Sequence, residues 1–152
     1  MAIGVAVQVS DELTALLHTQ SRRVPATAAA RNAARATCRI VGVTDAELSI
    51  TWLDDAAIAG LNYQYLGHVG PTDVISFELY EHDEIPVGDV YIGFEEAERQ
   101  AAAHGCTLEE ELVRLAVHGT LHILGFDHPG STGRTESEMW MLQEAIVAEV
   151  LA

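Results

Sequence analysis

The sequence contains no lysine, and its eight arginines stand against 23 acidic residues, for a formal net charge of −15. Such an excess argues against a protein that holds nucleic acid by bulk electrostatic attraction, because phosphates carry the same sign. Five arginines nevertheless lie between Gln20 and Gly42 with no acidic residue among them. Three of these, Arg31, Arg35 and Arg39, recur every four residues and so share one stripe of a helix. This stripe is either a contact for a phosphate backbone or an ordinary solvated helix face.

Paired cysteines and long apolar segments are also missing. Cys38 and Cys106 are the only cysteines and form no CxxC pair, which predicts free thiols in a reducing compartment. No apolar run approaches the roughly 20 residues that cross a membrane. Residues 1–9 have no positive flank, so they do not resemble a secretory signal. We therefore expect a soluble cytoplasmic protein.

The composition indicates a globular chain, with 49% hydrophobic and 20% charged residues over a length of 152. Strands are predicted where apolar and polar residues alternate, and helices where apolar residues recur every three to four positions. The predicted strands are 3–9, 47–53, 72–80 and 87–92, the last two paired as an antiparallel hairpin. The predicted helices are 26–40, 56–65, 94–103, 107–124 and 134–151. We expect one α+β domain over residues 1–152.

Three of the seven histidines fall within residues 118–128. His118 and His122 are four residues apart on a predicted helix, one turn from each other and about 6 Å apart at their Cβ atoms. Gly125 follows where a helix commonly ends, so the chain can turn and bring His128 back. Three neutral imidazoles with a fourth position left open are a common arrangement for catalytic zinc. The spacing alone predicts a hydrolytic metal site.

A zincin-type metallopeptidase is an alternative interpretation of these histidines. In such enzymes a glutamate follows the first histidine and acts as general base, whereas here that position is Gly119. A peptidase would need a base from elsewhere. Gly119 instead allows the helix backbone to approach a neighbouring element or a ligand closely. The histidines share a polar stripe with Glu111 and Arg114, which we expect on a face that need not be buried.

The segment H-G-T-L-H-I-L-G-F-D-H at residues 118–128 resembles the signature of the YbeY family, bacterial single-strand endoribonucleases that act in ribosomal RNA maturation. The likeness extends over roughly residues 48–146. Its other landmarks occur in the family's order: Leu61-Asn62 with Tyr65, P-T-D-V-I-S-F at 71–77, Gly88-Asp89-Val90, Glu110-Glu111 and Met139 to Glu144.

The resemblance implies one zinc per chain, held by His118, His122 and His128, in a domain with a mixed four-stranded sheet packed with helices. It implies single-stranded RNA as substrate, and ribosomal RNA or a ribosomal subunit as partner. His118 and Asp127 are the candidate catalytic residues; the aspartate orients a histidine or shuttles a proton, or only caps the turn. The candidate RNA-binding residues are Arg31, Arg35, Arg39, Thr72, Asp73 and Ser76.

One position departs from the family pattern. Leu66 follows Tyr65 where the family usually has an arginine that is thought to matter for RNA cleavage. Leucine carries no charge and cannot fork to a phosphate. Either another group such as His68 or Arg114 takes this role, or the chain is a catalytically weakened, ribosome-associated RNA-binding protein.

Overall fold

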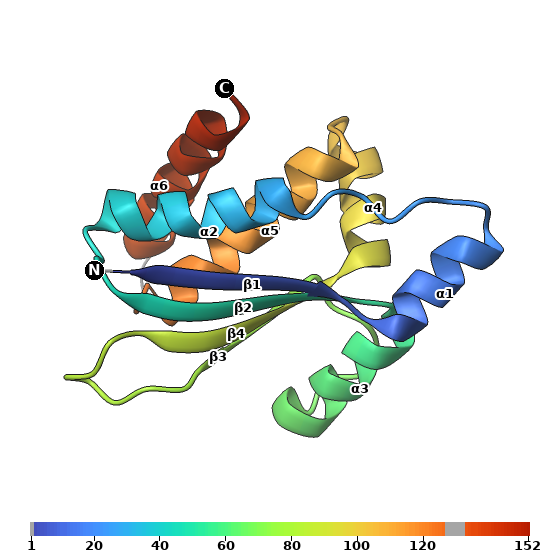
Figure 1. The fold of residues 1–152 in the computed structure, drawn as a ribbon, viewed down its shortest axis with the longest axis horizontal. Coiled ribbons are helices and arrows are strands. Elements are labelled where there is room, and N and C mark those ends of the chain that lie inside the picture. Colours follow the sequence, from blue (N-terminus) through green and yellow to red (C-terminus); the bar gives the residue numbers. More distant parts are fainter. Residues whose placement is uncertain (1, 127–132) are drawn as a thin grey trace.

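The computed structural model describes residues 2–126 and 133–152, which form one α+β domain (Figure 1). Four strands make a mixed sheet in the order β1-β2-β4-β3. The strands are β1 (Ile3–Val9), β2 (Ala46–Leu53), β3 (Val74–Glu78) and β4 (Val87–Gly93). β2 runs parallel to both β1 and β4, whereas β3 is an edge strand antiparallel to β4. The predicted mixed sheet and its hairpin are confirmed.

The strands form where the sequence alternates. In β2, Leu48, Ile50 and Trp52 are buried on one face, and the residues between them point to the other face. β3 is shorter than the predicted strand 72–80. Hydrogen bonds from Leu79 N to Val87 O (2.8 Å) and from Gly93 N to Asp73 O (2.8 Å) continue the pairing by only one residue at each end.

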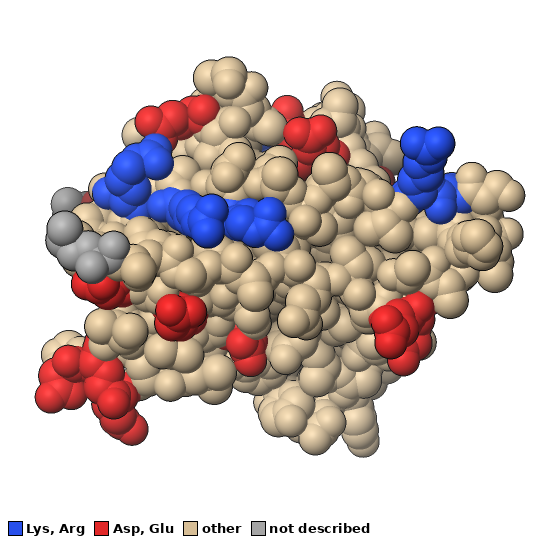
Figure 2. All heavy atoms as spheres, in the orientation of Figure 1, with Lys and Arg blue, Asp and Glu red and all other residues tan. Residues whose placement is uncertain are grey.

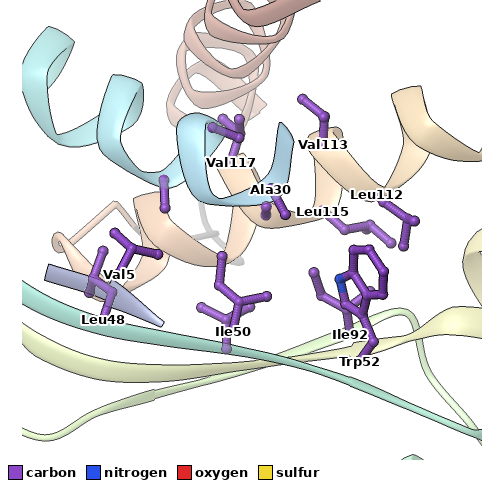
Figure 3. Packing of buried hydrophobic residues seen from close by; sticks show 14 of the residues in the cluster. Val5, Ala30, Leu48, Ile50, Trp52, Ile92, Leu112, Val113, Leu115 and Val117 are labelled. Carbon is purple, nitrogen blue, oxygen red and sulfur yellow. The ribbon is translucent and has the colours of Figure 1, made fainter. Parts of the chain in front are cut away.

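Six helices surround the sheet in the described part of the chain. They are α1 (Asp11–Thr19), α2 (Ala28–Val41), α3 (Asp55–Leu66), α4 (Phe94–His104), α5 (Leu108–Ile123) and α6 (Gly133–Leu151). α2, α5 and α6 lie over one face of the sheet and α3 lies on the other (Figure 1). The main core fills the space between the sheet and α2 and α5 (Figure 3). None of these helices is both long and apolar enough to cross a membrane.

Helix α5 is the central element of the core. Thr107 caps it, its hydroxyl oxygen accepting a hydrogen bond from Glu110 N at 3.1 Å as the sequence predicts. The helix is buried on almost every side, and Glu111 is only 2% exposed. The expectation that this polar stripe need not be buried is wrong for Glu111, because Arg114 beside it supplies an ion pair at 3.2 Å.

Helix α1 is not predicted by periodicity, although its signals are present. Ser10 caps it, accepting from Leu13 N at 3.1 Å, and two acidic residues occupy its first turn. Leu13 and Leu17 bury completely in the core. α2 begins at Ala28, two residues later than predicted, and ends at Gly42 in the left-handed conformation (φ 92°) as predicted. Both cysteines are free, as the sequence indicates.

Candidate active site

Gly119 brings α5 into direct contact with the sheet. A Cβ atom at this position would lie 2.5 Å from Val90 Cγ1 and 3.1 Å from Ser76 Oγ. The Ser76 hydroxyl donates a hydrogen bond to Gly119 O at 3.1 Å, so β3 and β4 both hold this turn of the helix. The prediction that Gly119 permits a close backbone approach is confirmed. The position has no room for the glutamate of a zincin-type peptidase.

His118 and His122 converge one turn apart on α5. Their Nε2 atoms are 3.1 Å apart, and their rings meet edge to face at a centroid distance of 4.6 Å. Two nitrogens on a tetrahedral zinc, at 2.0–2.1 Å each, lie about 3.4 Å from one another. The pair therefore fits two ligands of one ion. The other predicted ligand, His128, and the candidate Asp127 lie outside the described residues. Among the side chains that the structure describes, in residues 2–126 and 138–152, no group of three potential ligands gathers.

Gln143 on α6 fixes the orientation of His118. The glutamine is 3% exposed, and its Oε1 lies 2.6 Å from His118 Nδ1. Its amide nitrogen donates to Glu144 Oε2 at 3.2 Å. Burial raises the pKa of Glu144, but hydrogen bonds from Arg114 and Gln143 and the charge of Arg114 outweigh it, so the pKa is below the usual 4.5.

An ionised carboxylate only accepts hydrogen bonds, so the NH₂ group of Gln143 must face Glu144. The amide oxygen consequently faces His118, and Nδ1 of the imidazole must be the protonated nitrogen. In the neutral ring this leaves a lone pair on Nε2, the atom that points towards His122. A neutral histidine that donates from one ring nitrogen can bind a metal through the other.

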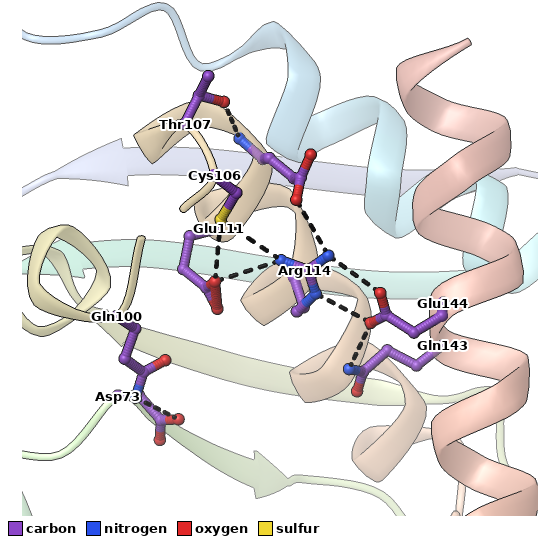
Figure 4. Close-up of polar contacts among 9 residues, drawn as sticks. Asp73, Gln100, Cys106, Thr107, Glu111, Arg114, Gln143 and Glu144 are labelled. Carbon is purple, nitrogen blue, oxygen red and sulfur yellow. Dashed lines mark hydrogen bonds and ion pairs between the residues drawn. The ribbon is translucent and has the colours of Figure 1, made fainter. Parts of the chain in front are cut away.

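Arg114 occupies the centre of a carboxylate cluster beside this contact (Figure 4). Its Nε and Nη2 atoms donate to the two oxygens of Glu144 at 2.9 and 3.0 Å. Further bonds run to Glu111 and Glu110, each at 3.2 Å. The hydrogen bond to Glu144 is the main cause that raises the pKa of the guanidinium above its usual value. Arg114 could contact a phosphate only by breaking these ion pairs, which disfavours it as a substitute for the family arginine.

A cleft of about 1020 Å³ extends along α5 between α4 and α6, and His118 is part of its wall. Asp73 closes it beside β3, its Oδ2 accepting from Gln100 Nε2 at 3.3 Å. Four carboxylates and one guanidinium line the cleft, so its charge is negative. Thr72 and Ser76 do not line it; Ser76 instead contacts the backbone of α5.

The predicted arginine stripe lies on α2, which contributes no residue to the cleft. Figure 2 shows a row of basic side chains across this face of the molecule. Arg39 also pairs with Glu149 on α6 at 3.3 Å. Leu66 is the last residue of α3 and is 51% exposed, while the ring of Tyr65 packs edge-on against Phe77 at 5.2 Å.

A family model described as Endoribonuclease YbeY matches residues 15–151. The chain belongs to the YbeY family. The resemblance seen in the sequence is thereby confirmed, and it extends beyond residues 48–146 at both ends. The matched part includes five of the six helices completely, among them α5 with its two histidines and α6 with Gln143.

Relatives in this YbeY family are similar over much of their length. A protein of Moorella thermoacetica named Endoribonuclease YbeY is 42% identical over 147 residues, 89% of this chain and 86% of its own. Another of that name, from Pelotomaculum thermopropionicum, is 47% identical over 97 residues, 59% of this chain and 64%, a little under two thirds, of its own. The solution structure of a protein from Thermotoga maritima superimposes with a TM-score of 0.59 at 25% identity, covering 96% of this chain and 88% of that one.

Proposed function

We propose that this YbeY family member is a zinc-dependent single-strand endoribonuclease that acts in ribosomal RNA maturation and ribosome quality control in the cytoplasm. The observation that carries the proposal is the convergence of His118 and His122 with Gln143 behind the first ring. The names of the relatives give the class of reaction, cleavage inside an RNA chain. A ribosomal subunit or its RNA is the proposed partner.

In this proposal His118, His122 and His128 hold one zinc per chain. When bound, zinc supplies a Lewis acid that activates a water or a ribose hydroxyl and polarises the phosphodiester. Gln143 keeps the proton of His118 on Nδ1, so that Nε2 is the nitrogen that would bind the zinc. Asp127 is the candidate for orienting a histidine or for moving a proton. Arg31, Arg35 and Arg39 contact phosphates outside the cleft, and Thr72, Asp73 and Ser76 belong to the RNA-binding side of the site.

Leu66 favours a second candidate, a ribosome-associated RNA-binding protein with weakened cleavage. The exposed leucine offers no charge at the family's arginine position, and Arg114 is already bound by three carboxylates. A metallopeptidase is disfavoured because the contacts of Gly119 with Val90 and Ser76 exclude the usual glutamate.

Cleavage of a fluorescently labelled single-stranded RNA with added zinc tests the proposal. The wild type should cleave, and His118→Ala should lose cleavage together with bound zinc, measured by elemental analysis. Leu66→Arg should raise the rate at least about tenfold, since removing a charge-stabilising donor commonly costs 10²–10³-fold. Leu151→Arg adds the same charge at the exposed end of α6 and should change nothing. If the wild type binds zinc and RNA without cleaving, and only the Leu66→Arg variant cleaves, the second candidate function is established. A wild-type protein that retains no zinc after incubation with zinc would contradict the zinc site in both candidate functions.

A further inference from the structure

Trp140 is an exposed aromatic residue in the wall of the acidic cleft. It is 56% exposed on α6, whereas its neighbour Met139 is 3% exposed and packs in the core. Trp140, Gln143 and Glu144 are spaced by three and four residues, so they share one face of the helix. Gln143 contacts His118, and Trp140 lies three residues before Gln143, about 4.5 Å along the helix axis.

The charge of the cleft decides which part of an RNA strand it can accept. Asp73, Glu110, Glu111 and Glu144 line it, and its one guanidinium, on Arg114, is engaged by three of these carboxylates. A phosphate that entered this cleft would be repelled by the carboxylates, and the guanidinium that could bind it is already engaged in ion pairs. A nucleobase is neutral, and its exocyclic amino groups can donate to carboxylate oxygens. The side chains of Glu110 and Glu144 remain 35% and 30% exposed for such contacts.

We propose that the cleft is a nucleobase site in which one unstacked base of single-stranded RNA lies against the indole of Trp140. This inference rests on the proposed function and specifies which part of the RNA enters the cleft. Proteins that recognise single-stranded RNA commonly stack splayed bases on aromatic side chains. The sugar-phosphate backbone then runs along the mouth of the cleft, on the side of His118, while its charge stays outside the carboxylate cluster.

The two tryptophans make the proposal measurable by intrinsic fluorescence. Trp52 is 1% exposed in the core, where it packs against Phe94, so it serves as an internal reference. A 2′-O-methyl octanucleotide should quench the emission of Trp140 in a saturable manner. An octamer with the same backbone but no bases should bind at least about fivefold more weakly, because stacking contributes a fold-change of roughly 5–150 per base.

Variants of exposed residues on α6 separate stacking from other effects. Trp140→Ala should weaken binding of the octanucleotide by about 5–150-fold, measured by anisotropy of a labelled strand, and Trp140→Phe should recover most of it. Met141→Ala is the matched control, since Met141 is 70% exposed on the same helix but does not line the cleft. Unchanged Trp52 emission shows that each variant is folded.

Equal affinity for the base-free octamer, or an unchanged affinity in Trp140→Ala, would overturn the assignment. If RNA at millimolar concentration does not quench the emission of Trp140, the nucleobase site is also contradicted, and a protein becomes the expected partner of this surface. These results are distinguishable from a failure of the proposed function. Binding that depends on the bases but leads to no cleavage would contradict the proposed nuclease function and support the nucleobase site. Cleavage that is unchanged by substitution of Trp140 would support the nuclease function and contradict the nucleobase site.

Discussion

Gln143 Oε1 lies 2.6 Å from His118 Nδ1, and the two side chains come from different helices, α6 and α5. The carboxylate of Glu144 determines which end of the glutamine amide faces the histidine. The nitrogen of His118 that points towards His122 is thus selected by residues on a neighbouring helix.

Replacing Gln143 with leucine should weaken zinc binding by about 10–100-fold, because it removes the partner that orients a metal-binding histidine. Competition with a chelator measures this. Gln143→Glu retains an acceptor oxygen for His118 but loses the donor to Glu144, so it should recover only part of the affinity. A purely structural role for Gln143 would lower the melting temperature of Gln143→Leu but leave the ring-nitrogen chemical shifts of His118 unchanged. That outcome would contradict the predicted role.

Gly119→Ala should lower the free energy of unfolding by about 1–3 kcal/mol, because its Cβ would overlap Val90 in a packed interface. Alanine favours a helix by about 1 kcal/mol over glycine, so the steric cost must exceed this gain. Gly60→Ala on α3 is the matched control; a Cβ there meets nothing within 4 Å, and the variant should be slightly stabilised. Urea denaturation measures the free energy of unfolding of both variants. If Gly119→Ala and Gly60→Ala stabilise the protein equally, the sheet moves to accommodate a Cβ atom at Gly119.

Changing Arg31, Arg35 and Arg39 together to glutamine should weaken binding of single-stranded RNA and reduce its salt dependence. Three lost phosphate contacts lower the slope of log K against log salt by about 2. Arg99→Gln removes one arginine from α4, away from this stripe, and should leave the slope unaltered. An unchanged slope in the triple variant would identify the stripe as an ordinary solvated face.

Glu144→Gln should lower the free energy of unfolding at pH 7 by about 1–3 kcal/mol, since it breaks a partly buried, bidentate pair with Arg114. The pKa of Glu144 is depressed in the folded protein. Its stabilising contribution is therefore fully present above 4.5 and is lost as the pH falls through the lower, folded pKa. Thermal unfolding from pH 7 to 3 measures this. The variant should lose less stability than the wild type over the acidic range; parallel curves would exclude the linkage.

Local sequence patterns predicted the parts of this molecule that depend on nearby residues. Alternation located all four strands, and the spacing of His118 and His122 placed two imidazoles together because a helix repeats every 3.6 residues. Gly119 was identified as a point of close approach for the same local reason. The family resemblance added the mixed, four-stranded character of the sheet and the class of reaction.

Features that depend on packing between distant segments were not predicted. Gln143 is 25 residues from His118 in sequence, and nothing in its own surroundings marks it apart from its place between Met139 and Glu144. The three carboxylates around Arg114 come from two helices, so the sequence did not show that Arg114 is already engaged in ion pairs. α1 escaped prediction because its nine residues are too few for the apolar spacing to repeat, although Leu13 and Leu17 are buried and Leu16 packs against the core.

The helix that carries His118 and His122 has most of its residues buried. Amides in such an element exchange with solvent only when the whole domain opens. The backbone positions of the two histidines are therefore set by the same forces that keep the chain folded. In the proposed zinc site, the ion would therefore meet two imidazoles carried by a backbone that is already fixed before it binds.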